Sequence, residues 1–237
     1  MSNLGGKRIL VVGMGGLGCP AALALAQAGI GRLTIVDPDV VEASNLHRQP
    51  WYRVSDIGQP KVEVAASRLQ AAFPALAVAS RRSRVDDSRA AVLADGHDVI
   101  IDGTDDVHAK FVLSDAGVRL GIPVVYGGVL RTVGQAMLIA PGGPCLRCLF
   151  DEPTAGEELP SCARTGVLGT VAGLVGAIQA SLALSVLTRD GWRPGLLVTV
   201  DAWKMSQRVI AVPRAPDCVA CATRDAGLDR FAAGAAR

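Results

Sequence analysis

The segment Gly13–Gly18, with the sequence GMGGLG, constrains the fold of this chain more than any other feature. It follows an apolar run at Arg8–Val12, predicted as a buried strand, and leads into an Ala- and Leu-rich run at Leu17–Ala28, predicted as a helix. A second short strand is expected at Leu33–Asp37. Two strands and the helix between them make a βαβ unit, whose crossover favours a parallel sheet.

The glycines at positions 13, 15 and 18 satisfy the pattern G-x-G-x-x-G. Gly13, Gly15 and Gly18 permit a sharp turn and let a phosphate approach backbone N–H groups at the positive end of the helix. Asp37 lies 19 residues beyond Gly18, where a carboxylate can accept hydrogen bonds from ribose hydroxyls. The pattern predicts a nucleotide site but does not distinguish NAD from ATP. A Gly-rich turn without a ligand is the alternative.

A cluster of polar residues follows Asp37 in the long irregular segment Pro38–Pro60. It includes Asn45 and Arg48, and Lys61 begins the next predicted helix. A dinucleotide contains one pyrophosphate, for which the glycine turn and the helix dipole largely suffice. Additional Arg and Lys side chains indicate more negative charge, such as a triphosphate whose β and γ groups must leave. Taken singly, each charge is also compatible with a solvated loop residue.

Two acidic residues, Asp105 and Asp106, end an apolar segment at Asp98–Asp106 that we predict to be a later strand. Open α/β sheets bind their ligands at the carboxyl ends of parallel strands. A carboxylate in this position can hold Mg²⁺ against phosphate oxygens. Both residues are therefore candidates for binding the nucleotide, and Asp105 for binding magnesium.

The whole pattern predicts an α/β fold, a Rossmann-like doubly wound sheet that is mainly parallel and has an antiparallel β extension. Residues 1–237 are expected to form one domain with a nucleotide-binding half at about 6–130 and a second half at about 131–225. Further helices are predicted at Lys61–Phe73 and Val107–Leu120, and further strands at 76–80, 123–129, 131–140 and, as a pair with a turn near Trp203–Ser206, within 196–212.

The charge balance argues against nucleic acid or an anionic membrane as the main partner, because 24 basic residues face 22 acidic ones and the net charge is only +2. Aromatic residues make up only 4% of the chain, which disfavours a base-stacking surface. The N-terminus leads almost directly into the first predicted strand, without a separate apolar segment and cleavage site. We therefore expect a cytoplasmic protein.

One uncharged stretch, Thr165–Thr188, has the length and composition of a transmembrane helix, with 24 residues between two arginines. It also contains four Gly, one Gln, two Ser and three Thr residues, and no second span follows. We favour a buried or subunit-interface helix in a soluble fold, since helices that are apolar all round are expected there too.

Four of the six cysteines occur as C-x-x-C pairs, Cys145 with Cys148 and Cys218 with Cys221. In a reducing compartment this spacing points to metal binding or redox work rather than to structural disulfides. Four thiolates can close a tetrahedral zinc site with no open position, which is typical of structural zinc. Such a site would clamp the C-terminal tail to the core. A redox pair and unligated thiols are the alternatives.

Cys162 stands alone, just before the apolar stretch. A cysteine near a helix N-terminus can have a lowered pKa and act as a nucleophile, and a bystander role is the alternative. Cys19, directly after the glycine turn, is expected to be a small core residue.

These motifs together resemble the ThiF/MoeB/HesA group of ubiquitin-like-protein adenylyltransferases, the bacterial relatives of ubiquitin-activating enzymes. The resemblance extends from about Gly6 to Cys221, nearly the whole chain. The segments that carry it are GMGGLG, VDPDVVEASNLHRQ, GQPK, DGTDD, CLRC, SCARTGVLG and CVAC.

The resemblance implies an ATP-dependent reaction that adenylates the C-terminal glycine of a ubiquitin-like sulfur carrier of ThiS or MoaD type, ending in Gly-Gly, and releases pyrophosphate. Sulfur would come later, from a separate donor protein. The family also implies a homodimer, a carrier-binding second half and structural Zn²⁺ on the four paired cysteines.

The resemblance also assigns roles to single residues. Gly16 would lie against the nucleotide, and Asp37 would hold the ribose. Asn45, Arg48 and Lys61 would contact the phosphates, with Arg48 stabilising charge as pyrophosphate leaves. Asp105 matches the residue needed for Mg²⁺. Cys162 matches a cysteine that takes part in sulfur transfer in ThiF-like proteins and is dispensable in MoeB-like ones.

Three departures from the family pattern stand out. The chain starts after the point where members usually carry an N-terminal segment whose Arg reaches the partner subunit's phosphates, so we expect a misplaced start codon, an enzyme that works without that Arg, or impaired activity. Asp106 and Ser114 replace usual Asn residues, and an extra carboxylate could strengthen metal binding or repel phosphate.

We see no rhodanese-like extension after Cys221 and therefore expect sulfur to come from another protein. Two rival functions stay open: a non-catalytic scaffold that binds nucleotide or carrier, and an NAD(P)-dependent oxidoreductase. The pathway, whether thiamin, molybdopterin or another sulfur insertion, is not named by the sequence.

Overall fold

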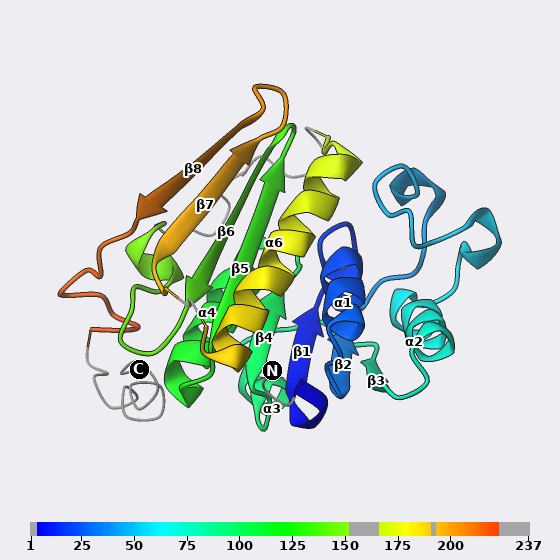
Figure 1. Ribbon diagram of the computed structural model, residues 1–237, viewed down its shortest axis with the longest axis horizontal. Helices are drawn as coiled ribbons and strands as arrows, with labels where there is room; N and C mark the ends of the chain where they lie inside the picture. Colours follow the sequence, from blue (N-terminus) through cyan, green and yellow to red (C-terminus); the bar gives the residue numbers. More distant parts are fainter. Residues whose placement is uncertain (1–3, 152–165, 191–192, 223–237) are drawn as a thin grey trace.

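The structure is a computed structural model, and it describes residues 4–151, 166–190 and 193–222. One sheet of eight strands forms its centre, in the order β3-β2-β1-β4-β5-β6-β7-β8, with helices on both faces (Figure 1). The strands are β1 (Arg8–Val12), β2 (Arg32–Val36), β3 (Ala77–Arg81), β4 (Val99–Asp102), β5 (Val124–Leu130), β6 (Val133–Ile139), β7 (Leu196–Asp201) and β8 (Ser206–Ala211).

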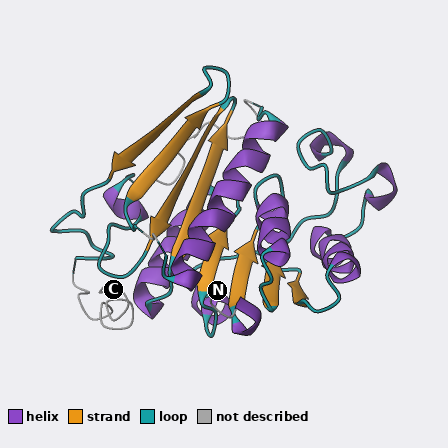
Figure 2. Cartoon of the chain, viewed as in Figure 1, coloured by secondary structure: helices purple, strands orange, loops and turns teal. Residues whose placement is uncertain are grey.

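Helices connect the strands of the parallel part of the sheet, a further helix lies between β6 and β7, and together they cover both faces. They are α1 (Gly18–Gln27), α2 (Lys61–Ala72), α3 (Ala90–Ala94), α4 (Val107–Leu120) and α6 (Gly169–Thr188). Short 3₁₀ turns occur at Leu4–Gly6, Ala43–Asn45, Val54–Asp56 and Leu146–Cys148. Figure 2 shows the long connection between β2 and α2 as a loop with two of these turns.

Strands β1 to β5 pair in parallel, and β6, β7 and β8 extend the sheet in antiparallel fashion. A parallel connection must return the chain to the starting edge, and each of the four here carries a helix. Tight turns join β5 to β6 and β7 to β8, and in them Arg131 and Met205 take positive φ angles of 55° and 48°, whereas the connection from β6 to β7 is long and contains helix α6. The predicted α/β fold with an antiparallel extension is confirmed.

Alternating side chains of the central strands divide the core into two layers. Ile9 and Val11 of β1 point into a cluster with α1, α2 and α6. Leu10 and Val12 point into the opposite cluster, which contains α4 and the paired cysteines. Since both faces of β1 are buried, its sequence reads as a continuous apolar run.

The apolar helix α6 is built into the fold. It runs along the sheet beside α1 (Figure 1). A Cβ on Gly176 would lie 2.4 Å from the carbonyl oxygen of Leu17, so the two helices approach closely. The buried Gln179 donates from Nε2 to the carbonyl oxygens of Asp102 and Val125, over 2.7 and 3.0 Å. By length and composition α6 also passes as a membrane span, but half of its most apolar window is buried inside the protein.

Some boundaries differ from the sequence prediction. The predicted strand at Asp98–Asp106 ends at Asp102, because the Asp102 carboxylate accepts hydrogen bonds from the N–H and hydroxyl of Thr104 and turns the chain. Helix α6 begins at Gly169 rather than at Thr165, which lies outside the described residues. The short helix α3 was not predicted.

Candidate functional site

The glycine-rich turn joins β1 to α1 and packs against the end of β4. Gly13 has a φ of +88°, and a Cβ on it would lie 2.6 Å from the carbonyl carbon of Gly103. A Cβ on Gly18 would lie 1.7 Å from the carbonyl oxygen of Gly13. Side chains are therefore excluded at both positions. Gly15 and Gly16 line the pocket described below, whereas Gly18 lies behind it and serves the packing of the turn.

Asp37 directly follows β2 and is only 5% exposed. Its Oδ2 accepts a hydrogen bond from the N–H of Met14 over 2.6 Å, and its Oδ1 accepts one from the N–H of Asp39 over 2.8 Å. Burial raises the pKa of this carboxyl above its usual value, and the ammonium of Lys61 opposes that shift. Asp37 lines the pocket, where its carboxylate can accept further hydrogen bonds from hydroxyl groups.

Arg48 is oriented by neighbours in its own segment. Its Nη2 donates to the Oδ1 of Asn45 over 2.5 Å, and its Nη1 donates to the carbonyl oxygen of Ser44 over 3.4 Å. The Nδ2 of Asn45 in turn donates to Glu42 Oε2 over 3.4 Å. This chain of hydrogen bonds places the guanidinium at the pocket wall.

The start of α6 braces the same segment. A Cβ on Gly169 would lie 3.0 Å from the Cα of Arg48, and a Cβ on Gly16 would lie 3.1 Å from the Arg48 carbonyl oxygen and 3.0 Å from the Cβ of Ala172. Arg48 is thus held between the glycine turn and a helix more than a hundred residues away along the chain. The sequence offers no local signal for this contact.

Lys61 is the first residue of α2 and is 5% exposed. Its Nζ lies 3.1 Å from the Oδ2 of Asp39. A buried ammonium needs such a partner, because leaving it unpaired would cost several kcal/mol, roughly. The Lys61 side chain lines the same pocket as Asp37 and Arg48.

Asp105 and Asp106 lie in the loop from β4 to α4 and also line the pocket. Asp106 is the N-cap of α4, and its Oδ1 accepts from the N–H of Ala109 over 3.1 Å. Its Oδ2 lies 3.5 Å from the Nη1 of Arg84, in the loop after β3. Within the described residues, the exposed Asp105 carboxylate has neither a hydrogen-bond nor an ion-pair partner.

All these side chains converge on one pocket of about 330 Å³ at the carboxyl ends of the parallel strands. Helices α1, α4 and α6 begin at its wall, and their N-termini favour a negatively charged ligand. The predicted residues on its lining are Gly13, Gly15, Gly16, Asp37, Asn45, Arg48, Lys61, Asp105 and Asp106.

Sequence reasoning missed several pocket residues, including Glu42, Gln49, Ser83, Arg84 and Thr104. The basic run at Arg81–Arg84 was an available signal, because it follows another parallel strand and so reaches the same edge of the sheet. Gln49 ends the segment VDPDVVEASNLHRQ but was assigned no role; its buried side chain packs on the glycine turn, with Nε2 3.3 Å from where a Gly15 Cβ would lie.

A second, more apolar pocket of about 590 Å³ adjoins the first. Leu17, Thr104, Asp105 and Val129 line both pockets. Its remaining walls come from α4, the β5–β6 hairpin and the segment after the first cysteine pair. The shared residues make Asp105 the meeting point of the two cavities.

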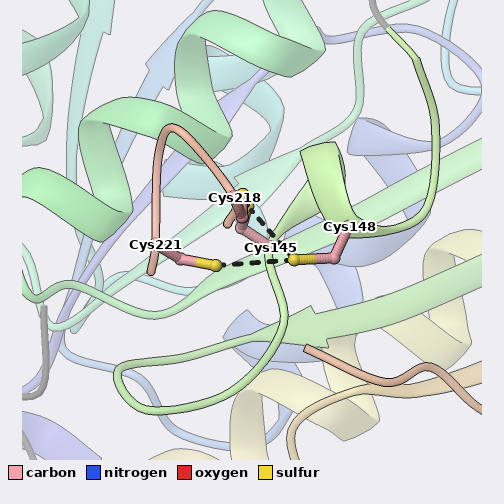
Figure 3. A group of neighbouring side chains, drawn as sticks. All are labelled: Cys145, Cys148, Cys218 and Cys221. Carbon is pink, nitrogen blue, oxygen red and sulfur yellow. Dashed lines mark hydrogen bonds between the residues drawn. The ribbon is translucent and has the colours of Figure 1, made fainter. Parts of the chain in front are cut away.

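The four paired cysteines come together on the α4 side of the sheet (Figure 3). The Sγ atoms of Cys145 and Cys148 lie 4.0 Å apart, those of Cys145 and Cys218 3.5 Å, and those of Cys148 and Cys221 3.4 Å. Tetrahedral zinc with Zn–S bonds of about 2.3 Å would place its sulfurs about 3.8 Å apart. The cluster therefore fits Zn²⁺, and none of these cysteines forms a disulfide.

The thiols of the cluster differ in acidity. Burial raises the pKa of Cys145. For Cys218, burial is outweighed by hydrogen bonds from the backbone N–H groups of Cys221 and Ala220, which lower the pKa to about 7. Preformed N–H donors to sulfur are a common support for bound thiolates.

Neighbouring side chains hold both cysteine turns in place. Arg147 makes a bidentate ion pair with Asp115 of α4, at 2.8 to 3.1 Å. Ser114, the other departure from the family pattern, is buried, and its Oγ accepts from the N–H of Leu146 over 3.2 Å. On the tail, Arg214 donates to the carbonyl oxygens of Cys221 and Ala222. Ser114 thus supports the first cysteine turn.

The two cysteines outside the cluster are Cys162 and Cys19. Cys162, the candidate for sulfur transfer, lies outside the described residues. Cys19 is buried, and its Sγ donates to the carbonyl oxygen of Met14 over 3.3 Å. Burial raises the pKa of Cys19 to about 12, so it is an unreactive core thiol as predicted.

The fold and these two centres define a doubly wound α/β protein with a charged pocket at its strand ends and a four-cysteine cluster on one face. A model of the ThiF family matches residues 1–220. This chain belongs to the ThiF family.

The curated relatives are similar over nearly the whole chain. One is the SAMP-activating enzyme E1 of Haloferax volcanii, 41% identical over 224 residues that cover 94% of this chain and 82% of that protein. Another is the sulfur carrier protein adenylyltransferase of Thermus thermophilus, 39% identical over 221 residues that cover 90% and 81%. The adenylyltransferase and sulfurtransferase uba4 of Emericella nidulans is 39% identical, but the match covers only 48% of its length.

Among solved structures, E. coli MccB with ATP has the same fold, with a TM-score of 0.81 over 92% of this chain and 68% of MccB. The sequences are 19% identical. The resemblance to MccB therefore concerns the fold alone.

Proposed function

We propose that this protein uses ATP to adenylate the C-terminal glycine of a ubiquitin-like sulfur carrier and releases pyrophosphate. The observation that carries the proposal is the convergence of Asp37, Asn45, Arg48, Lys61 and Asp105 on one pocket. Two relatives at about 40% identity are named as enzymes that activate or adenylate such carriers. Family membership and these names support the nucleotidyltransferase class.

The charges of the pocket support a role for Mg²⁺. Its lining carries three cationic side chains against five carboxylates, namely Arg48, Lys61 and Arg84 against Asp37, Asp39, Glu42, Asp105 and Asp106. A triphosphate would add further negative charge, so a divalent cation is needed to balance it. Asp105 is the candidate ligand, because its carboxylate is exposed at the pocket and unpaired among the described residues. Asp105 would hold Mg²⁺ at the pocket, and the ion would supply positive charge against the phosphates.

The side chains of the pocket position the nucleotide. Asp37 accepts from the ribose hydroxyls, while Arg48 and Lys61 contact the phosphates. The carrier's carboxylate attacks the α-phosphorus, the bond from that phosphorus to the bridging oxygen breaks, and pyrophosphate leaves. Little covalent help from protein is required in phosphoryl-type transfer, so orientation and cationic stabilisation supply most of the rate.

The apolar second pocket is the proposed site for the end of the carrier, since it meets the nucleotide pocket at Asp105. Residues from both predicted halves line this pocket, so the division into a nucleotide-binding half and a carrier-binding half remains a prediction. A homodimer, a separate sulfur donor, a cytoplasmic location and Zn²⁺ on the cysteine cluster belong to the same proposal. A role for Cys162 in sulfur transfer remains a prediction.

The test is ATP–pyrophosphate exchange with and without candidate carriers that end in Gly-Gly. We expect exchange that depends on one carrier and is lost in Lys61→Ala and Asp105→Ala. Lys204→Ala is the matched control, because Lys204 is 80% exposed on the β7–β8 turn and lines neither pocket. ATP binding without exchange for any carrier would refute adenylation and favour a binding scaffold. Binding of nicotinamide nucleotides without ATP would favour an oxidoreductase.

A further inference from the structure

Lys110 and Asp102 form a buried ion pair directly behind Asp105. The Nζ of Lys110 lies 3.1 Å from Asp102 Oδ2, and the two side chains are 10% and 1% exposed. Sequence reasoning assigned neither residue a role. A buried pair of this kind is weak evidence for stability, because desolvation offsets much of the attraction. Stability alone therefore does not explain why this ion pair lies beside the Asp105 loop.

The ion pair makes hydrogen bonds to all three polar groups of Thr104, the residue before Asp105. The Oδ1 of Asp102 accepts from the Thr104 N–H over 3.1 Å and from the Thr104 hydroxyl over 2.7 Å. The Nζ of Lys110 donates to the Thr104 carbonyl oxygen over 2.7 Å. That carbonyl belongs to the peptide that joins Thr104 to Asp105. Lys110 thus fixes the plane from which the Asp105 side chain projects.

Lys110 also joins this loop to β5. Its Nζ donates to the Gly127 carbonyl oxygen over 2.6 Å and lies 5.3 Å from the ring centre of Tyr126. The pairing between β4 and β5 covers only two residues of each strand, so the strands separate beyond Ile101 and Val125. Lys110 bridges the separating strands from the α4 side, and Gln179 bridges them from the α6 side.

We infer that Lys110 and Asp102 are positioning residues for Asp105, which set its carboxylate for a divalent cation on the nucleotide. This rests on the proposed role of Asp105. Lys110 itself has its three N–H bonds engaged by Asp102, Thr104 and Gly127, so it acts through Asp105 and not by contact with the phosphates. Partners that orient a metal ligand typically contribute about 10–100-fold to metal affinity.

The test measures ATP binding by calorimetry, once in EDTA and once across a Mg²⁺ titration. The variants are Lys110→Met, which keeps the length of the side chain without its charge, Lys110→Arg and Asp102→Asn. We expect Lys110→Met and Asp102→Asn to raise the half-saturating Mg²⁺ concentration about tenfold or more, with ATP affinity in EDTA changed less than about twofold. Lys110→Arg should restore part of the Mg²⁺ effect. Lys204→Met is the matched control and should behave as wild type.

A purely structural role predicts a different result. ATP affinity would then fall by the same factor with and without Mg²⁺, together with the thermal midpoint, and the inference would be overturned. It would also be overturned if wild-type ATP binding did not depend on Mg²⁺. Since no carrier is needed, a wild-type protein that binds Mg²⁺ and ATP but catalyses no exchange would refute the proposed function and leave this inference standing.

Discussion

The backbone N–H of Met14 donates a 2.6 Å hydrogen bond to the Oδ2 of Asp37, which ties the glycine-rich turn after β1 to the end of β2. One carboxylate therefore fixes the shape of the turn and also presents acceptors to the pocket. Its second oxygen is held by the N–H of Asp39, whose side chain pairs with Lys61. Asp37, the glycine-rich turn and Lys61 are thus coupled through neighbouring residues.

Asp37→Asn is expected to weaken ATP binding about 10- to 100-fold, because a hydrogen bond to a charged group contributes about 1.5–3 kcal/mol. Equilibrium binding of ATP and of 2′-deoxy-ATP measures the effect. Wild type should prefer ATP, and the variant should discriminate less between the two. Asp98→Asn, at the opposite end of β4, is the control. Equal discrimination in both variants would rule out a ribose contact.

The pH dependence of ATP binding should include a contribution from the titration of the Asp37 carboxyl. Burial raises the pKa of Asp37 above its ordinary 3.8, so it takes up its proton at a higher pH than an exposed aspartate would. Protonation removes the negative charge that accepts from Met14 and from the ribose. Affinity is therefore expected to be full above the raised pKa of Asp37 and to fall as the pH drops through it. Asp37→Asn should remove this component, and an unchanged acid limb in that variant would contradict the assignment.

Two glycines one turn apart in α6 are expected to respond oppositely to alanine. A Cβ on Gly173 meets nothing within 4 Å, so Gly173→Ala should stabilise the protein by about 0.5–1 kcal/mol through helix propensity. A Cβ on Gly176 would lie 2.4 Å from the Leu17 carbonyl oxygen and 2.7 Å from the Pro20 Cγ. Gly176→Ala should therefore destabilise it by about 1–3 kcal/mol. Urea unfolding measures both, and equal effects would show that α1 and α6 do not pack this closely.

Asp106→Asn distinguishes two roles for the extra carboxylate. Asparagine also caps helices well, and the ion pair with Arg84 is largely exposed, so the free energy of unfolding should change by less than about 1 kcal/mol. Removing one of five pocket carboxylates should strengthen ATP binding a few-fold, roughly. A loss of Mg²⁺ dependence in this variant would instead identify Asp106 as a metal ligand. Asp105→Asn is the matched comparison and should lose that dependence.

Removal of zinc is expected to destabilise the protein. The cluster joins the tail at Cys218 to the turn at Cys145, and structural zinc contributes directly to folding free energy. We expect one zinc per chain by atomic absorption, a lower thermal midpoint after chelation, and loss of the metal in Cys218→Ser. Cys19→Ser should retain full zinc content. An unchanged midpoint after chelation would refute a structural zinc site.

Much of this architecture could be predicted because its signals are local. The strand and helix periods at Arg8–Val12 and Val107–Leu120 arise from which faces of these elements are buried. The glycine spacing of the turn and the C-x-x-C spacing of the cysteine pairs can each be recognised within a few residues of sequence. The carboxyl ends of parallel strands must share one edge, so Asp37 and Asp105 could be placed together from the order of elements.

Other features depend on contacts between distant segments, for which the sequence carries no periodic signal. The sequence by itself determined the doubly wound fold, many of the residues that line the pocket at the strand ends, and the cysteine set. Only the tertiary structure decided that α6 braces Arg48, that Ser114 supports a cysteine turn, and that Lys110 bridges β4, β5 and the Asp105 loop. The physical reason is that a single Gly, Ser or Lys has no distinctive local pattern, and its role arises only from the acceptors and backbone that folding brings within contact distance.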